Sequence, residues 1–166
     1  MNHIQIHDLK SADNKVLSEI FEINEGYTPF LGPLETIEKL KELVFHSNFS
    51  IFLTTNGLIC AFLVCFRENS EYQSKNYQFF QKRFKKFFYI DRIGVVKTFK
   101  NKGLGTFLYR EIDKICEKDS LPICAEVNIV PMNKESVNFH EKMGFNMISD
   151  AYASPNYAVR YFEKCM

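Results

Sequence analysis

The sequence predicts a mixed α/β fold, and three observations support this prediction. An apolar run at residues 89–96 has the composition of a buried strand, and a basic turn containing glycine follows it. The next segment has apolar residues at positions 104, 107, 108, 112 and 115, which is the spacing of an amphipathic helix. An Asn56-Gly57 pair separates two further apolar runs, as in a β-hairpin. We therefore expect a single α/β domain over residues 1–166.

Composition narrows the class of protein. A chain of 166 residues with 46% hydrophobic and 25% charged residues is typical of a soluble globular protein. Its net charge of +1 gives no reason to expect a nucleic-acid or membrane partner. The five cysteines and four histidines lack metal-ligand spacing, so we expect no metal site. An odd number of thiols without a signal peptide indicates a cytoplasmic protein.

The first half of the chain contains signals for three strands and two helices. Alternation at residues 3–7 predicts a strand, and a helix is expected from about Asp13, with Asp13 or Ser11 as its cap. A second helix is expected at about 35–46. The two arms of the hairpin follow, and the second, residues 58–66, is apolar throughout, as expected of a central strand.

A long loop rich in glycine and proline separates the two helices at residues 24–36. Long ordered loops often carry function, so Asn24, Glu25 and Tyr27 are candidate substrate contacts. The alternative is a connector between helices, in which proline and glycine only shape the chain. The sequence leaves both interpretations open.

Residues 67–87 interrupt the periodic pattern before the apolar run at 89–96. Five basic residues beyond Arg67 alternate with six aromatic residues, a mixture that suits single-stranded nucleic acid. The segment is otherwise an insertion whose aromatic rings pack inward, or a lid over an acceptor site. We favour inward packing, because no other part of the chain has a basic excess.

The basic turn at 100–105 has the features of a phosphate-binding site. The first amides of a helix lack internal partners and lie at the positive end of the helix dipole. Gly103 and Gly105 allow close approach of a ligand to the backbone, and Lys100 and Lys102 add positive charge. The turn lacks the Walker pattern, and Leu108 interrupts the dinucleotide pattern G-x-G-x-x-G.

The pattern Lys100-x-x-Gly103-x-Gly105 resembles the acetyl-CoA turn [Q/R]-x-x-G-x-[G/A] of the GNAT acetyltransferase superfamily, although lysine departs from its usual first residue. The later segment from Asn133 to Gly144-Phe145 resembles the family pattern N-x-x-[AS]-x-x-x-[YH]-x-x-x-G-F. Nearly the whole chain also resembles a group of uncharacterised predicted acyltransferases within this superfamily. The resemblance implies a mixed, mostly antiparallel central sheet flanked by about four helices.

The resemblance also implies acetyl-CoA as the cofactor. Its diphosphate is expected on the amides of residues 102–106, and its pantetheine arm along residues 93–95. The expected cofactor-binding residues are Ile93, Gly94, Val95, Lys100, Asn101, Lys102, Gly103, Leu104, Gly105, Thr106, Asn133 and His140.

Charged residues interrupt two apolar runs, at Asp91-Arg92 and at Glu126. A charge in a buried strand is costly unless it is paired or faces a cleft. One interpretation is an ion pair between Arg92 and Glu126. The other is a polar floor where an amine meets a carboxylate, with Asp91 and Glu126 as candidate bases. Substrate contacts are then expected from Tyr89, Arg92 and Asn128.

A short helix is expected at 134–143, with Asn133 as its cap and Gly144 at its end. His140 stands where the resemblance places a tyrosine that lies near the CoA sulfur. It is therefore the candidate general acid for the leaving thiolate, and the alternative is a structural histidine. Two closing strands are expected at about 145–149 and 157–163.

These inferences combine into one functional hypothesis. The chain is expected to transfer an acetyl group from acetyl-CoA to a primary amine of a small molecule or peptide, by direct attack in a ternary complex. Family members are often dimers, but no feature of the sequence fixes the oligomeric state. The rival hypotheses are a non-catalytic acyl-CoA sensor and, less favoured, a nucleic-acid-binding module that uses residues 75–86.

Overall fold

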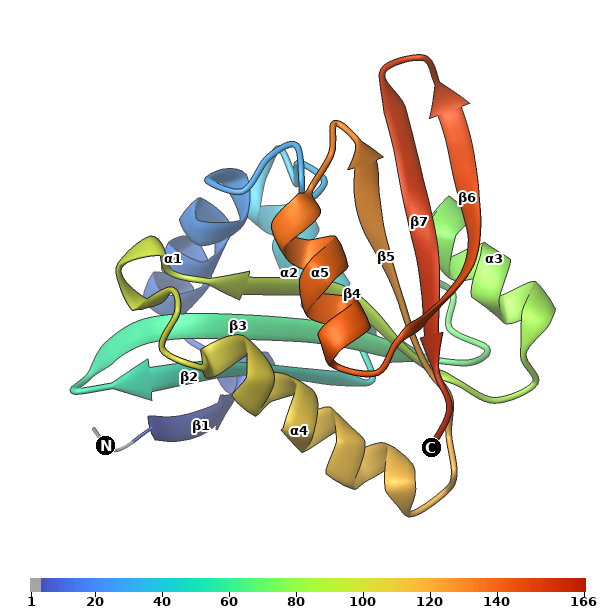
Figure 1. The fold of residues 1–166 in the computed structure, drawn as a ribbon. Coiled ribbons are helices and arrows are strands. Elements are labelled where there is room, and N and C mark those ends of the chain that lie inside the picture. Colours follow the sequence, from blue (N-terminus) through green and yellow to red (C-terminus); the bar gives the residue numbers. More distant parts are fainter. Residues whose placement is uncertain (1–3) are drawn as a thin grey trace. The chain divides into compact units, whose positions relative to one another are not determined.

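The computed structural model describes residues 4–166, and within them seven strands form one sheet in the order β1-β2-β3-β4-β5-β7-β6 (Figure 1). The pairs β1–β2, β2–β3, β5–β7 and β6–β7 are antiparallel, whereas β4 and β5 are parallel. The expected mixed, mostly antiparallel sheet is confirmed. The strands are β1 Ile4–Asp8, β2 Phe49–Thr55, β3 Leu58–Arg67, β4 Phe88–Val95, β5 Ile123–Val130, β6 Asn146–Ser154 and β7 Tyr157–Lys164.

Five α-helices accompany these strands in the described part of the chain, against the expected four or so. They are α1 Asn14–Glu25, α2 Ile37–His46, α3 Lys75–Arg83, α4 Leu104–Glu117 and α5 Lys134–Lys142. The additional helix is α3, inside the segment that showed no helical periodicity. None of the described helices is both long enough and apolar enough to cross a membrane.

The structure divides into two compact units. The first comprises the chain up to Phe66 together with Arg92–Tyr109, and the second comprises Arg67–Asp91 together with Arg110–Met166. The chain passes from one unit to the other within β4, between Asp91 and Arg92.

Local signals in the first unit agree with the structure. Asp13 caps α1, and its carboxylate accepts a hydrogen bond from the amide of Val16. Asn56 and Gly57 both have positive φ, as the tight hairpin turn requires. The helix α1 extends to Glu25, so Asn24 and Glu25 lie in its last turn and not in the loop. The predicted first strand began at residue 3, which lies outside the described residues; β1 begins at Ile4.

The second unit is built around β5, β7 and β6, with α3 and α5. Asn133 caps α5 as predicted, and Gly144 has a φ of +86° just beyond the end of this helix. Ser74 caps α3 by accepting a hydrogen bond from the amide of Tyr77. The aromatic residues Tyr77, Phe80 and Phe87 are fully buried. The segment 67–87 therefore contributes to the core of this unit, which is the inward packing favoured above.

Candidate functional site

The turn that opens α4 lies wholly in the first unit and keeps the backbone geometry that the motif suggested. Asn101 and Gly103 have φ values of 61° and 80°, in the left-handed region that favours asparagine and glycine. A Cβ added at Gly103 would meet no atom within 4 Å, so the turn is open at this point. Since α4 begins at Leu104, its first amides face outward beside this opening. The turn therefore fits an anionic group such as a diphosphate.

Aromatic residues hold the lysines of this turn in place. The ammonium group of Lys100 lies 5.3 Å from the centre of the Tyr27 ring, and that of Lys102 lies 4.9 Å from the centre of the Phe99 ring. Such cation–π contacts fix a charge without neutralising it. Both cations therefore lie on the turn that leads into α4.

The last residues of β4, where the pantetheine arm was expected, are held by contacts within the first unit. A Cβ at Gly94 would lie 2.4 Å from Cε1 of Phe62, so close ring packing requires glycine here. The hydroxyl group of Tyr27 donates a hydrogen bond to the carbonyl oxygen of Val95. The structure thus gives Gly94 a packing role that the motif did not show, and it places Tyr27 against the predicted cofactor segment.

Three of the expected substrate contacts instead anchor the loop that follows α1. Asn24 is fully buried, and its Oδ1 accepts a hydrogen bond of 2.8 Å from Nη1 of Arg92. Arg92 also donates to the carbonyl oxygen of Gly32 at 2.6 Å, and Glu25 accepts from the amide of Leu34 at 2.8 Å. These contacts favour the connector interpretation for Asn24 and Glu25 and give Arg92 a supporting role.

A carboxyl cluster is centred on Glu126 in the second unit. Oε1 of Glu126 accepts hydrogen bonds from the hydroxyl group of Tyr89 at 3.0 Å and from Nδ2 of Asn76 at 3.1 Å. The side chain keeps some exposure, but Oε2 is buried and has no hydrogen-bond partner within residues 4–166. The alternative of an ion pair between Arg92 and Glu126 would join residues of different units and stays a prediction.

The electrostatics of this cluster favour the protonated acid. Burial, and next the neighbouring charge of Asp91, raise the pKa of Glu126 to about 8. Burial and the charges of Glu126 and Asp91 also raise the pKa of Tyr89 well above its ordinary value. Tyr89 therefore stays protonated at neutral pH and keeps donating to Glu126. A carboxyl group with a pKa near the working pH is suited to proton transfer.

Sequence reasoning missed Asn76, which lies on α3. Its Nδ2 donates to Glu126, and its Oδ1 accepts a hydrogen bond of 3.0 Å from the hydroxyl group of Tyr161. Asn76 thus links Tyr161 to the carboxyl group. No pattern in the segment 67–87 pointed to it, because the partners are 50 and 85 residues away in the chain.

His140 is buried among aromatic rings in the second unit. Its Nδ1 lies 2.8 Å from the carbonyl oxygen of Ser136, which makes Nδ1 the protonated nitrogen, and its ring stacks on Phe162 with centroids 5.5 Å apart. Burial lowers the pKa of His140 to about 4, so the ring is neutral at pH 7. This environment favours the structural alternative over a proton donor.

The structure brings the expected site residues together in two groups. In the first unit, Tyr27 contacts both Val95 and Lys100. In the second unit, Tyr89 and Glu126 are hydrogen-bonded beside Asp91. The side chain of Asn133 caps α5, and its amide donates to the carbonyl oxygen of the buried Asn128 at 3.0 Å.

A sheet of this strand order, with a glycine turn that opens a helix after β4, is the architecture of an acetyltransferase fold. The chain belongs to the acetyltransferase (GNAT) family, whose sequence profile matches residues 17–145. A search of curated proteins finds no sequence match.

Solved structures share the fold over nearly the whole chain. The ribosomal-protein-S18-alanine N-acetyltransferase from Escherichia coli has a TM-score of 0.70 at 16% identity, with 98% of this chain and 94% of that chain covered. Arabidopsis thaliana NAA60 in complex with acetyl-CoA has a TM-score of 0.72 at 14% identity, with 99% of both chains covered. PH1933 from Pyrococcus horikoshii has a TM-score of 0.73 at 22% identity, again with 99% of both chains covered.

Proposed function

We propose that this protein is an acetyl-CoA-dependent N-acetyltransferase that acts on a primary amine by direct attack in a ternary complex. Membership of the GNAT family supports this proposal, as does the fold shared with a protein solved in complex with acetyl-CoA. The observation that carries it is the open turn at Gly103, flanked by two fixed lysines at the start of α4.

The turn is the proposed site of the diphosphate. The amides of residues 102–106 would bind its oxygens, with the charge of Lys100 nearby. Residues 93–95 would hold the pantetheine arm. When bound, acetyl-CoA supplies an acyl thioester, a carbonyl group that an amine can attack.

The acceptor amine must lose its proton before it can attack. A lysine-like amine has a pKa near 10.4, so deprotonation at neutral pH costs roughly 4–5 kcal/mol. We propose Glu126 as the base, because Tyr89 and Asn76 fix its Oε1 while Oε2 has no partner within residues 4–166. Asp91 is the alternative base and influences the titration of Glu126.

The remaining assignments stay predictions. His140 was expected to protonate the leaving thiolate, and its neutral, buried ring supports a packing role more strongly. We also expect the protein to act in the cytoplasm. All five cysteines are free thiols, which supports this location.

Cofactor binding tests the central assignment. In isothermal titration, acetyl-CoA should bind the wild-type protein with saturation, and Gly103→Trp should abolish binding by filling the open turn. Gly103→Asn is the milder variant, because asparagine tolerates positive φ, and it should weaken binding about tenfold. Circular dichroism confirms that both variants fold. Wild-type affinity in both folded variants would remove the diphosphate from this turn.

Turnover separates the enzyme from the acyl-CoA sensor. A panel of primary amines and short peptides is assayed for release of free CoA by thiol titration. The enzyme should release CoA with at least one amine faster than in the absence of any amine. A sensor would bind acetyl-CoA in the titration and release none with the entire panel.

A further inference from the structure

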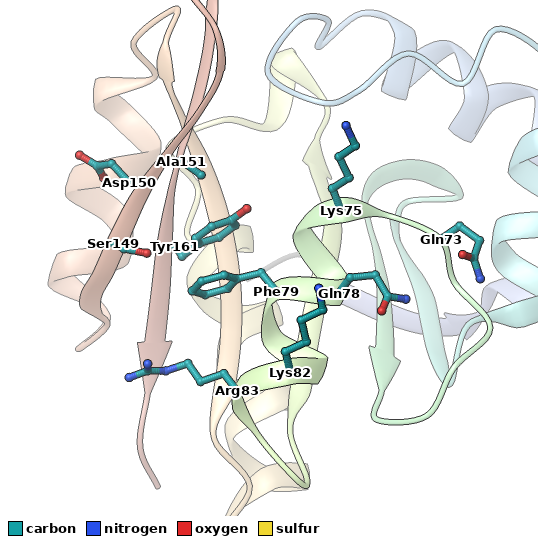
Figure 2. A pocket seen from close by; sticks show the side chains of 10 residues that line it. All are labelled: Gln73, Lys75, Gln78, Phe79, Lys82, Arg83, Ser149, Asp150, Ala151 and Tyr161. Atoms are coloured by element: carbon teal, nitrogen blue, oxygen red, sulfur yellow. The ribbon is translucent and has the colours of Figure 1, made fainter.

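A groove in the second unit has no part in the mechanism proposed above. Its cavity has a volume of about 670 Å³ and is lined by residues of α3 and β6 and by Tyr161 of β7 (Figure 2). From α3 it takes residues 75, 78, 79, 82 and 83, which recur at helical spacing and form one stripe of the helix. The groove is therefore a surface built by α3 against the sheet.

The charge of this groove is positive. Lys75 and Lys82 have no acidic partner within residues 4–166, and Arg83 lies 3.8 Å from Glu163. The carboxylate of Asp150 is held by Arg160 at 2.8 and 2.9 Å, which neutralises the one acidic side chain of the lining. A chain with a net charge of only +1 thus concentrates cations here.

The spacing of the cations favours an extended ligand. Lys75 and Lys82 are seven residues apart in α3, which is about 10 Å along the helix axis. A peptide in the extended polyproline II conformation advances about 3.1 Å per residue with three residues per turn, so acidic side chains three positions apart lie on one face about 9 Å apart. A single small anion meets only one of these lysines.

The strand side of the groove suits an extended peptide as well. Ser149, Asp150 and Ala151 are consecutive residues of β6, and neighbouring side chains of a strand point to opposite faces. A groove that is lined by three in succession touches the backbone of the strand as well as its side chains. Since β6 is the last strand in the sheet order, its outer edge offers backbone groups to an added segment.

The aromatic residues argue against a nucleic-acid ligand. The ring of Phe79 stacks on the ring of Tyr161 with centroids 3.9 Å apart and an angle of 11° between the planes. Each ring therefore covers a face of the other, as Figure 2 shows, and the nearby Tyr77 and Phe80 are fully buried. Base stacking needs an accessible ring face, which this pair does not provide on its contacting sides.

We propose that the groove between α3 and β6 binds an extended protein segment with acidic residues three positions apart. Lys75 meets one acidic side chain, and Lys82 meets the next. The stacked pair of Phe79 and Tyr161 forms the apolar wall between these two positions.

The test measures peptide binding without acetyl-CoA. A fluorescein-labelled ten-residue peptide with glutamate at every third position is titrated with protein, and its anisotropy is recorded. Saturable binding that weakens with added salt is expected. The double variant Lys75→Glu/Lys82→Glu should bind at least tenfold more weakly. The exposed Lys118, on a different surface segment, provides the matched control Lys118→Glu, which should stay within twofold of wild type.

Any one of the following outcomes would overturn the proposal. These are equal binding of a peptide with glutamine in place of glutamate, equal binding by the double variant, and displacement of the acidic peptide by a tenfold lower concentration of oligouridine. Absence of saturable binding to the wild type would overturn it too. Thermal unfolding confirms that both variants fold. Titration with acetyl-CoA is a separate measurement, so this proposal and the proposed acetyl transfer can fail independently.

Discussion

At the scale of the residue, Glu126 combines a fixed oxygen with a buried oxygen that has no partner within residues 4–166. A base must be ionised to act, and the pKa of Glu126 is raised to about 8. We therefore expect kcat/KM to increase with pH and to level off above about pH 8. Because Asp91 influences this titration, the measured pKa describes the pair of carboxyl groups.

Glu126→Gln tests this role. Glutamine keeps an oxygen that can accept from Tyr89 and Asn76, so the fold should survive, while a base is lost. We expect kcat to decrease by a factor of about 10²–10⁴, with loss of the increase near pH 8. The measurement is a pH profile of CoA release with a responsive amine. An unchanged profile in Glu126→Gln, together with an altered one in Asp91→Asn, would transfer the role to Asp91.

The pKa of His140 makes the stability of the fold depend on pH. In the unfolded chain its pKa returns to about 6.5, whereas in the fold burial lowers it to about 4. The unfolded state therefore binds the proton first as the pH decreases. The stabilisation is complete above pH 6.5 and is lost progressively down to pH 4, by about 3 kcal/mol.

His140→Phe removes this titration while keeping an aromatic ring next to Phe162. Urea unfolding between pH 4 and 7 should show a smaller loss of stability at acid pH than in the wild type. If the residue only packs, turnover should stay within a factor of about two. A decrease in kcat of tenfold or more at unchanged acetyl-CoA affinity would restore the general-acid role.

At the scale of the element, β4 depends on the absence of a side chain at Gly94. A Cβ there would lie 2.4 Å from the Phe62 ring, which is closer than side chains approach without rearrangement. Gly94→Ala should lower the free energy of unfolding by about 1–3 kcal/mol, as overpacking does. Urea denaturation measures this decrease in the free energy of unfolding. Phe62→Leu in the same chain makes room, so the double variant should lose less than the sum of both changes.

Local chemistry explains which elements could be predicted. The caps Asp13 and Asn133 and the Asn56-Gly57 turn act on backbone groups within three residues, so the sequence alone shows them. The helix α3 was missed because its aromatic residues do not follow one stripe. Phe79 packs on Tyr161, whereas Tyr77 and Phe80 enter the core of the second unit. Tertiary packing specifies this helix.

At the scale of the whole molecule, the family and the fold could be predicted, because both rest on short motifs in a fixed order. The hydrogen-bond partners of the candidate base, Glu126, could not be predicted from the sequence. Tyr89 and Asn76 lie 37 and 50 residues from Glu126 in the chain, and no periodic pattern relates them. The hydrogen bond between Asn24 and Arg92 could not be predicted either, because these residues are 68 positions apart in the chain.

The helix α3 lies in the segment that connects β3 and β4, and through Asn76 it donates a hydrogen bond to the carboxyl group of Glu126. Shortening this stretch to a simple linker would leave a half-sequestered acid with one donor instead of two. A relative with a shorter segment between β3 and β4 would need another donor to hold the carboxyl group of Glu126. We therefore expect a relative with a shorter segment between these two strands to carry a residue other than glutamate at the position of Glu126.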